Sequence, residues 1–168
     1  MTSLMERWYR KRHPGKDVPY KYKYGLWTIF TKPVRKWFSA VVAPAIPYTG
    51  LRMWVYRRCG YKIGKGTFIG MHCYLDDVCW DLMEIGNGVT ISYGVYFALH
   101  GRKQAHNRLV IRDGVYIGMR ANIVARTNLE IGELAIIGAG TLVNRSVPAG
   151  ATAVGVPCRF LEHPAEGN

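Results

Sequence analysis

The sequence predicts a parallel β-helix that follows a short, partly helical extension. The first observation is a six-residue repeat from Ile63 onward, in which an aliphatic residue, a small residue and four variable residues alternate. A period this short indicates a repeat fold and fits one strand and one turn, but not a helical unit. The second observation is charge: residues 1–60 hold 13 Lys and Arg against 2 Asp and Glu, whereas residues 61–168 hold 10 against 9. We therefore expect a basic extension (1–60), a repeat domain (61–161) and a tail (162–168).

The aliphatic position of each repeat is expected to point into the β-helix and stack on its equivalents in neighbouring coils. Each buried side chain of this kind contributes roughly 1.5–3 kcal/mol before entropy is counted. The small residue that follows lies at a turn, where a larger side chain would meet the next coil. A slip of one residue would turn the buried set outward, so the register is well specified. The set comprises Ile63, Ile69, Leu75, Ile85, Ile91, Phe97, Ile111, Ile117, Ile123, Ile131, Ile137 and Val143.

The repeat is interrupted in three places. Residues 81–84 are inserted before Ile85, a loop at 101–108 separates Phe97 from Ile111, and two extra residues precede Ile131. Loops that leave a rigid scaffold are where function concentrates. The excursion loop 101–108 is therefore the first candidate for a functional segment.

The extension is expected to form two helices. One spans residues 31–42 with Pro33 in its first turn, and the other spans residues 49–60 with Thr49 as N-cap and Gly60 as the stop. One role for the extension is to cover the open end of the β-helix, which is an unpaired edge. The alternative is contact with an anionic membrane surface, because the segment mixes Lys and Arg with four of the five Trp. Nucleic-acid binding also fits a basic aromatic patch, but no motif supports it.

The cellular compartment is indicated by the cysteines and by the N-terminus. The four Cys show no disulfide spacing, so they are interpreted as reduced, buried residues. The N-terminus is charged and lacks a secretory signal, and the apolar run 37–48 contains two prolines and is too short to span a bilayer. We therefore predict a cytoplasmic protein, with peripheral contact at the inner membrane surface as the sharper alternative.

Four polar residues are the candidates for chemistry. His100 ends a predicted strand and opens the excursion loop, which also contains His106. Asp76 and Asp77 lie at a corner about two coils earlier, and coils of about eighteen residues would stack such corners on neighbouring edges. A carboxylate beside a His can orient it or bind a polar acceptor. Without further support, an isolated His is more often a surface or structural residue than a catalyst, and the Asp-Asp pair fits a solvated turn equally well.

Several segments resemble the hexapeptide-repeat acyltransferases, and most closely the sugar O-acetyltransferases that act on galactosides, maltose, streptogramins, O-antigen or capsule. These segments are Ile-Gly-Asn-Gly-Val-Thr-Ile-Ser (85–92), Ile-Gly-Met-Arg-Ala-Asn-Ile (117–123), Ile-Ile-Gly-Ala-Gly-Thr-Leu-Val (136–143), Ser-Val-Pro (146–148) and Val-Gly-Val-Pro-Cys-Arg (154–159). The resemblance covers about two-thirds of the chain, residues 61–161. It identifies the superfamily and leaves the substrate open.

The resemblance implies a left-handed parallel β-helix, assembled as a homotrimer with active sites between subunits and with acetyl-CoA as cosubstrate. The catalytic His of such enzymes opens the extended loop, so His100 is the expected general base. Asp76 falls at the polar position on the acceptor side, where the galactoside and maltose enzymes have Asn. It is expected either to bind the acceptor or to hold His100. Asp77 and His106 are the further candidates for acceptor binding.

The resemblance also implies where the CoA moiety lies. Small corner residues of the later coils would hold the pantetheine arm, and the matching positions are Gly118, Met119, Gly138 and Ala139. Asn144 and Arg145 stand where the family often has Thr-Lys. Arg145 and Arg159 are candidates for the CoA phosphates, since guanidinium pairs well with phosphate. The alternative is that both are ordinary surface arginines.

The sequence thus predicts an acetyl-CoA-dependent O-acetyltransferase for a hydroxyl of a sugar or cell-surface glycan precursor. An imidazole base is suited to this reaction because it takes up and releases a proton near neutral pH. N-acylation of an amino sugar is the alternative within the same fold. A non-catalytic scaffold is another, as is a γ-carbonic-anhydrase-like zinc enzyme that uses His72, His100 and His106, although the His-rich repeats of that family are absent. We expect no metal and no nucleic-acid partner.

Overall fold

The computed structural model describes residues 4–16, 18, 26–101 and 106–161. The predicted tail (162–168) and the middle of the excursion loop (102–105) lie outside the described residues. The chain divides into two compact units, Met1–Trp37 and Phe38–Asn168. The first unit contains α1 (Leu4–Arg12) and α2 (Leu26–Trp37). The second unit contains the whole repeat domain and the helices that directly precede it.

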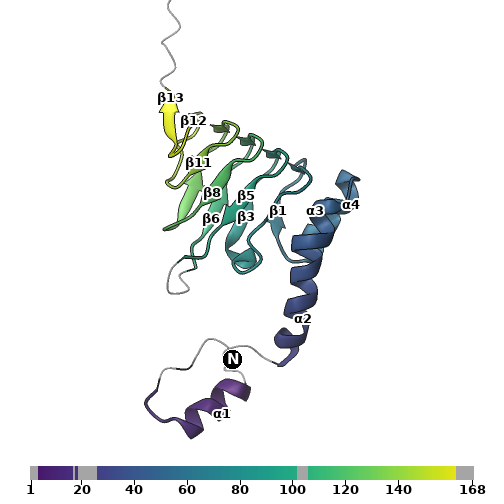
Figure 1. The fold of residues 1–168 in the computed structure, drawn as a ribbon, viewed down its shortest axis with the longest axis vertical. Helices are drawn as coiled ribbons and strands as arrows, with labels where there is room; N and C mark the ends of the chain where they lie inside the picture. Colours follow the sequence, from purple (N-terminus) through teal and green to yellow (C-terminus); the bar gives the residue numbers. More distant parts are fainter. Residues whose placement is uncertain (1–3, 17, 19–25, 102–105, 162–168) are drawn as a thin grey trace, which may run out of the picture. The chain divides into compact units, whose positions relative to one another are not determined.

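The second unit is a solenoid of short strands, seen edge-on in Figure 1 with β1 at one end and β13 at the other. The six-residue repeat produces strands of two or three residues, each followed by a corner. They are β1 (Lys62–Ile63), β2 (Phe68–Ile69), β3 (Met83–Ile85), β4 (Thr90–Ile91), β5 (Tyr96–Ala98), β6 (Leu109–Ile111), β7 (Tyr116–Ile117), β8 (Asn122–Val124), β9 (Leu129–Ile131), β10 (Ile136–Ile137), β11 (Leu142–Val143), β12 (Thr152–Val154) and β13 (Arg159–Leu161).

The strands form three sheets, which we name face A (β1-β3-β6-β9), face B (β2-β4-β7-β10-β12-β13) and face C (β5-β8-β11). Neighbouring strands are parallel except for β12 and β13, which form an antiparallel pair at the C-terminal end. The predicted fold class, a left-handed parallel β-helix with a short helical extension, is confirmed. The first two coils are longer than the eighteen residues expected, since Lys62 pairs with Glu84 and Glu84 with Val110, whereas the last is shorter, since Ile136 pairs with Thr152. Asp76 consequently lies in the coil directly before that of His100, not about two coils earlier as the sequence predicted.

The core consists of the aliphatic residues that the repeat predicts. From Ile69 to Val143 the whole predicted set is buried, and only Ile63 in the first coil is partly exposed. The glycines that follow these residues lie against the next coil: a Cβ on Gly64 would come within 2.4 Å of the Gly86 carbonyl oxygen. The left-handed backbone occurs two positions later, where His72, Arg120 and Leu134 have φ of 56°, 54° and 56°. The lack of space for a side chain and the left-handed backbone angle, which the sequence suggested for one corner residue, therefore belong to two different corner positions.

The helices before the repeat differ in detail from the prediction. Pro33 lies inside α2 rather than in its first turn, because the helix begins at Leu26. A π-helix, η2 (Phe38–Val42), follows, and then α3 (Ala43–Ala45). Helix α4 spans Thr49–Arg58; Tyr48 is its N-cap, not Thr49, and Gly60 follows with a φ of +98° as predicted. Among the described residues, no helix is both long and apolar enough to cross a bilayer.

Helices α3 and α4 lie at the β1 end of the β-helix (Figure 1). Helix α4 is tied to the first coil by Arg52, whose Nε donates to the Ile69 carbonyl at 2.8 Å. The Tyr56 hydroxyl donates to the Cys73 carbonyl at 3.4 Å, and Tyr61 donates to that of Leu75 at 3.2 Å. This part of the extension therefore covers the open end of the solenoid.

All three interruptions of the repeat fall at one corner, between faces C and A. The first contains a short 3₁₀ helix, η3 (Trp80–Leu82), the second is the excursion loop, and the third is the turn before β9. The Asn107 side-chain amide joins the second to the third by donating to the Ala125 carbonyl at 2.6 Å. We call this edge the C–A corner, and it holds the candidate site.

Candidate active site

The centre of the C–A corner is a buried carboxylate. Asp76 is fully buried, and both of its oxygens are occupied. Its Oδ1 accepts the backbone N–H groups of Val78 and Cys79 at 2.9 and 3.1 Å. Its Oδ2 accepts those of Leu99 and His100 at 2.6 and 3.2 Å, together with the His100 ring. The turn after Leu75 and the end of β5 thus close around one side chain.

His100 is the partner that reaches solvent. Its Nδ1 lies 2.7 Å from Asp76 Oδ2, and its side chain is 44% exposed while that of Asp76 is 0% exposed. A carboxylate at Nδ1 favours the tautomer with the proton on that nitrogen, which leaves the lone pair on Nε2. The pair therefore presents an oriented imidazole with a basic nitrogen at the mouth of the excursion loop.

The pKa of Asp76 is lowered although the residue is buried. Burial acts to raise the pKa, but the hydrogen bonds from the Leu99 N–H, the His100 ring and the N–H groups of Cys79 and Val78 outweigh it. Hydrogen bonds to the charged form of a carboxyl group stabilise that form. Asp76 is therefore an anion held in place at neutral pH, able to stabilise a positive charge that develops on His100.

The other two acceptor candidates lie close to this pair. Asp77 is also buried, and its Oδ1 accepts a short hydrogen bond from the Tyr74 hydroxyl. Burial, followed by the hydrogen bond to Asp77, raises the pKa of Tyr74. His106 is joined to His100 by an antiparallel backbone bridge across the base of the loop. The structure thus brings Asp76, Asp77, His100 and His106 to one corner, while Asp76 and Asp77 show little surface to an acceptor.

The predicted CoA residues lie at a different corner, between faces B and C. Gly118, Met119 and Ala139 line an open groove of about 620 Å³. A Cβ on Gly118 would come within 2.6 Å of the Ala139 backbone nitrogen, so only glycine fits there. Gly138 lies beside this groove in the same corner, where a Cβ would come within 2.9 Å of Val154. The remaining groove residues are Pro47, Thr49, Arg52, Phe68, Gly70, Met71, Ser92, Tyr93 and Tyr116.

The candidates for phosphate binding lie at the last coil. The Arg145 Nη2 donates to the Cys158 carbonyl at 3.1 Å, and its guanidinium stands 4.8 Å above the Phe160 ring. Arg145 therefore fastens the C-terminal hairpin to the β-helix. Arg159 is exposed on β13, and Asn144 is half-buried beside β11. Their predicted role toward CoA stays a prediction.

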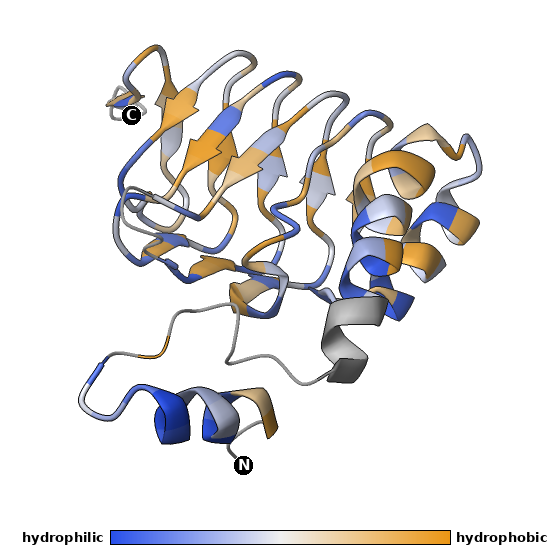
Figure 2. Cartoon of the chain, turned by 60° about the horizontal axis from the view of Figure 1, so that its bottom comes forward, coloured by the Kyte–Doolittle hydropathy of each residue, from blue (hydrophilic) through white to orange (hydrophobic). Residues whose placement is uncertain are grey.

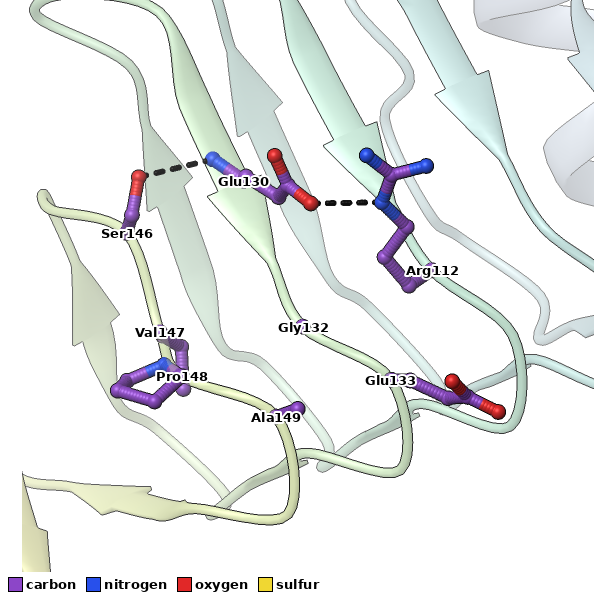
Figure 3. Close-up of a pocket in the computed structure, with 8 residues that line it drawn as sticks. All are labelled: Arg112, Glu130, Gly132, Glu133, Ser146, Val147, Pro148 and Ala149. Carbon is purple, nitrogen blue, oxygen red and sulfur yellow. Dashed lines mark hydrogen bonds and ion pairs between the residues drawn. The ribbon is translucent and has the colours of Figure 1, made fainter.

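A second groove lies on face A and the corner that follows it (Figure 3). It is lined by Arg112, Glu130, Gly132, Glu133, Ser146, Val147, Pro148 and Ala149. The Arg112 Nε donates to Glu130 Oε1 at 2.6 Å, and the Ser146 hydroxyl accepts the Glu130 N–H. These polar groups form hydrogen bonds with one another, and none of the predicted site residues lies in this groove. We therefore do not assign this groove to the reaction.

The described residues offer no activated thiol nucleophile and no cluster of metal ligands. All four cysteines are buried and free. Burial and, after it, the charge of Asp76 raise the pKa of Cys79 to about 12, so its thiol is not activated as a nucleophile. Within the described ranges, no group of three or more His, Cys, Asp or Glu side chains is arranged to hold a metal ion.

Sequence reasoning missed two features of these sites. Arg52 lines the groove although it is almost fully buried, and the Tyr74 and Tyr96 rings stack on face C with centroids 4.6 Å apart. A charged residue between the apolar residues Leu51 and Met53 was the available signal for Arg52. The stacked tyrosines required the coil length, which the six-residue period alone does not give.

Sequence comparisons find acetyltransferases. YvoF of Bacillus subtilis, a protein assigned to the acetyltransferases, is 29% identical over 136 residues, which is 79% of this chain and 78% of YvoF. A serine acetyltransferase of Bacillus licheniformis is 35% identical over 104 residues, 61% of this chain. The chain thus spans most of YvoF but only 45% of the serine acetyltransferase. No family model matches the sequence.

Comparisons with solved structures find the same repeat fold. A hexapeptide-repeat acetyltransferase of Vibrio cholerae has a TM-score of 0.65 and 20% identity, covering 80% of this chain and 91% of its own. A maltose O-acetyltransferase of Clostridium difficile has a TM-score of 0.65 and 21% identity, covering 84% and 90%. The Vibrio cholerae protein has also been solved with acetyl coenzyme A. The acetyltransferase relatives and the repeat-fold neighbours agree with the predicted resemblance to hexapeptide-repeat acyltransferases.

Proposed function

We propose that this chain, which shares its fold and its sequence relatives with the hexapeptide-repeat acyltransferases, transfers an acetyl group from acetyl-CoA to a hydroxyl of a sugar or glycan precursor. The observation that carries the proposal is the hydrogen bond between the buried Asp76 carboxylate and the exposed His100 ring. The pair lies beside the excursion loop, on a fold whose relatives are acetyltransferases.

In the proposed reaction, His100 Nε2 takes the proton of the acceptor hydroxyl while that oxygen attacks the thioester carbonyl of acetyl-CoA. The C–S bond then breaks, and the proton passes from His100 to the departing sulfur. Asp76 keeps the ring in the orientation that exposes Nε2 and offsets the positive charge of the protonated ring. Asp76 is therefore assigned to positioning His100, and acceptor contacts are left to groups around the loop.

The groove at the B–C corner is the proposed site of the pantetheine arm. Its floor is made of the closely packed corners of Gly118 and Ala139, where a linear chain can approach the backbone. Met119 provides an apolar side chain, 55% exposed, at its edge. Arg159 is the remaining candidate for a CoA phosphate, since the Arg145 guanidinium is engaged with Cys158 and Phe160.

We propose a homotrimer, which the separation of these two regions supports. His100 is at the C–A corner and the groove is at the B–C corner, so face C lies between them in one chain. A neighbouring copy that packs its groove against the C–A corner would complete the site. Repeat enzymes of this fold typically form trimers, and a heterologous contact closes into a ring when its rotation returns to the first copy, as it would in a trimer.

Three acceptor classes are candidates. Relatives are named for serine and structural neighbours for maltose, and both compounds carry hydroxyl groups. We favour a sugar hydroxyl; serine is the second candidate because several relatives 33–40% identical bear that name. N-acylation of an amino sugar is the third possibility, and it needs an amine that the base can deprotonate.

The test is CoA release from acetyl-CoA with maltose, galactosides, glucosamine and serine as acceptors. We expect a hydroxyl sugar to be acetylated and His100→Ala to lower kcat by about 10²–10⁴-fold. Full activity in His100→Ala would remove His100 from the mechanism. Preference for serine would change the acceptor class, and transfer to glucosamine only would indicate N-acylation.

We also propose that the protein acts in the cytoplasm and meets anionic membranes through residues 1–60. The buried, free cysteines are compatible with a reducing compartment. The sequence has no Asp or Glu between Asp17 and Asp76, so the basic residues of 18–75 are not offset by a carboxylate in that stretch of sequence. Such a segment is attracted to lipid headgroups of opposite charge.

A further inference from the structure

The helices at the β1 end of the β-helix expose an apolar outer surface. We propose that this surface is the membrane-docking face of the protein and that its partner is a bilayer containing anionic lipid. The inference rests on the proposed membrane contact and assigns it to a specific surface of the second unit. We define the docking face by its five exposed apolar or aromatic residues on η2, on α4 and at the α4 N-cap: Phe38, Val41, Tyr48, Leu51 and Trp54.

Helix α4 has two faces of different character. Its inner face is buried against the first coil and includes Met53, Val55 and Tyr56. Leu51 and Trp54, one turn apart, are 51% and 57% exposed on the other side. An amphipathic helix normally turns charged residues to water, so exposed Leu and Trp one turn apart indicate a surface with a partner.

The π-helix η2 adds to the same surface. It packs against α4, and both elements lie at the β1 end. Its inner side contains the buried Ser39, while Val41 is 56% exposed. Tyr48, the residue that precedes α4, is 75% exposed. Figure 2 shows that hydrophobic residues are prominent on these helices.

The charges around the docking face fit an anionic bilayer. Arg58 stands over the Trp54 ring, with its guanidinium carbon 5.6 Å from the ring centroid. Arg57, in the same last turn, donates to the carbonyls of Ile63 and Gly64. The surrounding sequence contains no acidic residue from 18 to 75. Aromatic rings with adjacent cations are typical of membrane interfaces, where rings lie at headgroup level and cations meet phosphate.

A second copy of the chain is a poorer occupant. Copies that pack side by side would meet through the faces of the β-helix, whereas the docking face lies at its end. In a trimer about an axis along the β-helix, three docking faces would point in the same direction. Three weak contacts with one bilayer bind about 10²–10⁴-fold more tightly than one.

The experiment is flotation of the full chain with vesicles of phosphatidylcholine, with and without about 30% phosphatidylglycerol. We expect binding to the anionic vesicles that weakens as salt is raised. The variant Leu51→Gln/Trp54→Gln should bind at least tenfold more weakly, and Arg58→Gln about fivefold more weakly. Leu161→Gln is the matched control, because Leu161 is 50% exposed on β13 at the opposite end of the solenoid.

Three results would overturn the inference. The first is that the full chain fails to float with anionic vesicles at low salt. The second is that Leu51→Gln/Trp54→Gln floats as well as Leu161→Gln. The third is that this double variant changes the oligomeric mass. The second result would move the contact to the first unit, and the third would make this surface an interface between copies. Acetyl transfer to a water-soluble acceptor is measured on the same variants. Weakened flotation with unchanged transfer separates the docking face from the proposed reaction.

Discussion

Asp76 determines both the geometry of the candidate site and its charge. Each of its oxygens accepts at least two donors, so an Asn at this position must place its NH₂ group against N–H groups. We expect Asp76→Asn to lower kcat/KM by about 10²–10⁴-fold, because the ring loses its orientation and its counter-charge. A pH–rate profile should also change shape, since the tautomer of His100 is no longer imposed.

Asp77→Asn is the control for this prediction. Asp77 is a buried neighbour that accepts from the Tyr74 hydroxyl, and Asn preserves an acceptor there. We expect less than a tenfold loss of kcat/KM with an unchanged pH–rate profile. Equal losses in the two variants, with the same profile, would mean that Asp76 only supports the fold.

The lowered pKa of Asp76 also determines how its contribution to folding stability changes with pH. A carboxyl group whose folded pKa lies below its unfolded value of about 3.9 stabilises the fold above that pH. The contribution is lost as the pH falls through the folded pKa. In thermal unfolding, the difference between wild type and Asp76→Asn should therefore be largest near neutral pH and shrink in acid. A difference that grows in acid would contradict this assignment.

Arg52 is the second residue on which the structure depends strongly, here through its contribution to folding stability. Its guanidinium is almost fully buried and donates to the carbonyls of Ile69 and Ile46, the latter at 2.5 Å, and to Thr49 Oγ1 at 3.3 Å. Lysine cannot reach all three oxygens from one nitrogen. We expect Arg52→Lys to lower the free energy of unfolding in urea by about 2–4 kcal/mol. Arg58→Lys, at an exposed position of the same helix, should change it by less than about 0.5 kcal/mol.

The sequence could predict His100 but not its exact partner atom. Its position at the start of the longest interruption is visible in the repeat, and the family resemblance points to the same residue. The choice between acceptor binding and orientation for Asp76 depended on the backbone N–H groups of Val78, Cys79 and Leu99, which only the folded turn brings together. A charge between Leu51 and Met53 was visible in the sequence, but the partners of Arg52 were not, because most of them are carbonyl oxygens, which have no signature in sequence.

At the scale of the element, the corners of the β-helix separate two requirements for glycine. Gly64 needs space, because a Cβ would lie 2.4 Å from the Gly86 carbonyl oxygen. Gly88 needs its backbone angle, with a φ of +61° and nothing within 4 Å of where a Cβ would lie. The strands themselves are only two or three residues long, so the corners fix the spacing of the coils.

These two requirements predict different responses to substitution. Gly64→Ala should lower the free energy of unfolding by about 2–3 kcal/mol, since backbone has to move. Gly88→Ala should cost about 1 kcal/mol, and Gly88→Asn less, because Asn tolerates the left-handed region. Gly64→Asn should be at least as harmful as Gly64→Ala. Urea unfolding of the four variants tests this, and a rescue by Asn at position 64 would contradict it.

At the scale of the whole molecule, the interruptions of the repeat matter more than its regular part. The sequence predicted the core because each aliphatic position repeats every six residues, and it located the three breaks. It could not predict that all three fall at one corner, since this depends on coils that pair Lys62 with Glu84 and Glu84 with Val110. The unequal coils put Asp76 directly beneath His100 and leave the regular B–C corner free to form the groove.

The separation of these two corners predicts that one chain alone holds no complete site. His100→Ala removes the base, and Ala139→Trp fills the groove at an exposed position without a clash inside the corner. Each variant alone should be nearly inactive. Co-expressed in equal amounts, they should recover about one quarter of wild-type kcat, because that fraction of sites pairs an intact His100 with an intact groove from the neighbour.

The mixed trimers distinguish the shared site from a site within one chain. If His100 and the groove of the same chain formed the site, every site in the mixture would carry one defect and activity would stay at the level of the single variants. Sedimentation of each variant should give the mass of three chains, which shows that neither substitution acts by dissociating the assembly. Mixing the purified variants without exchange of subunits should give no recovery. Recovery only on co-expression therefore requires that the base and the groove come from different copies.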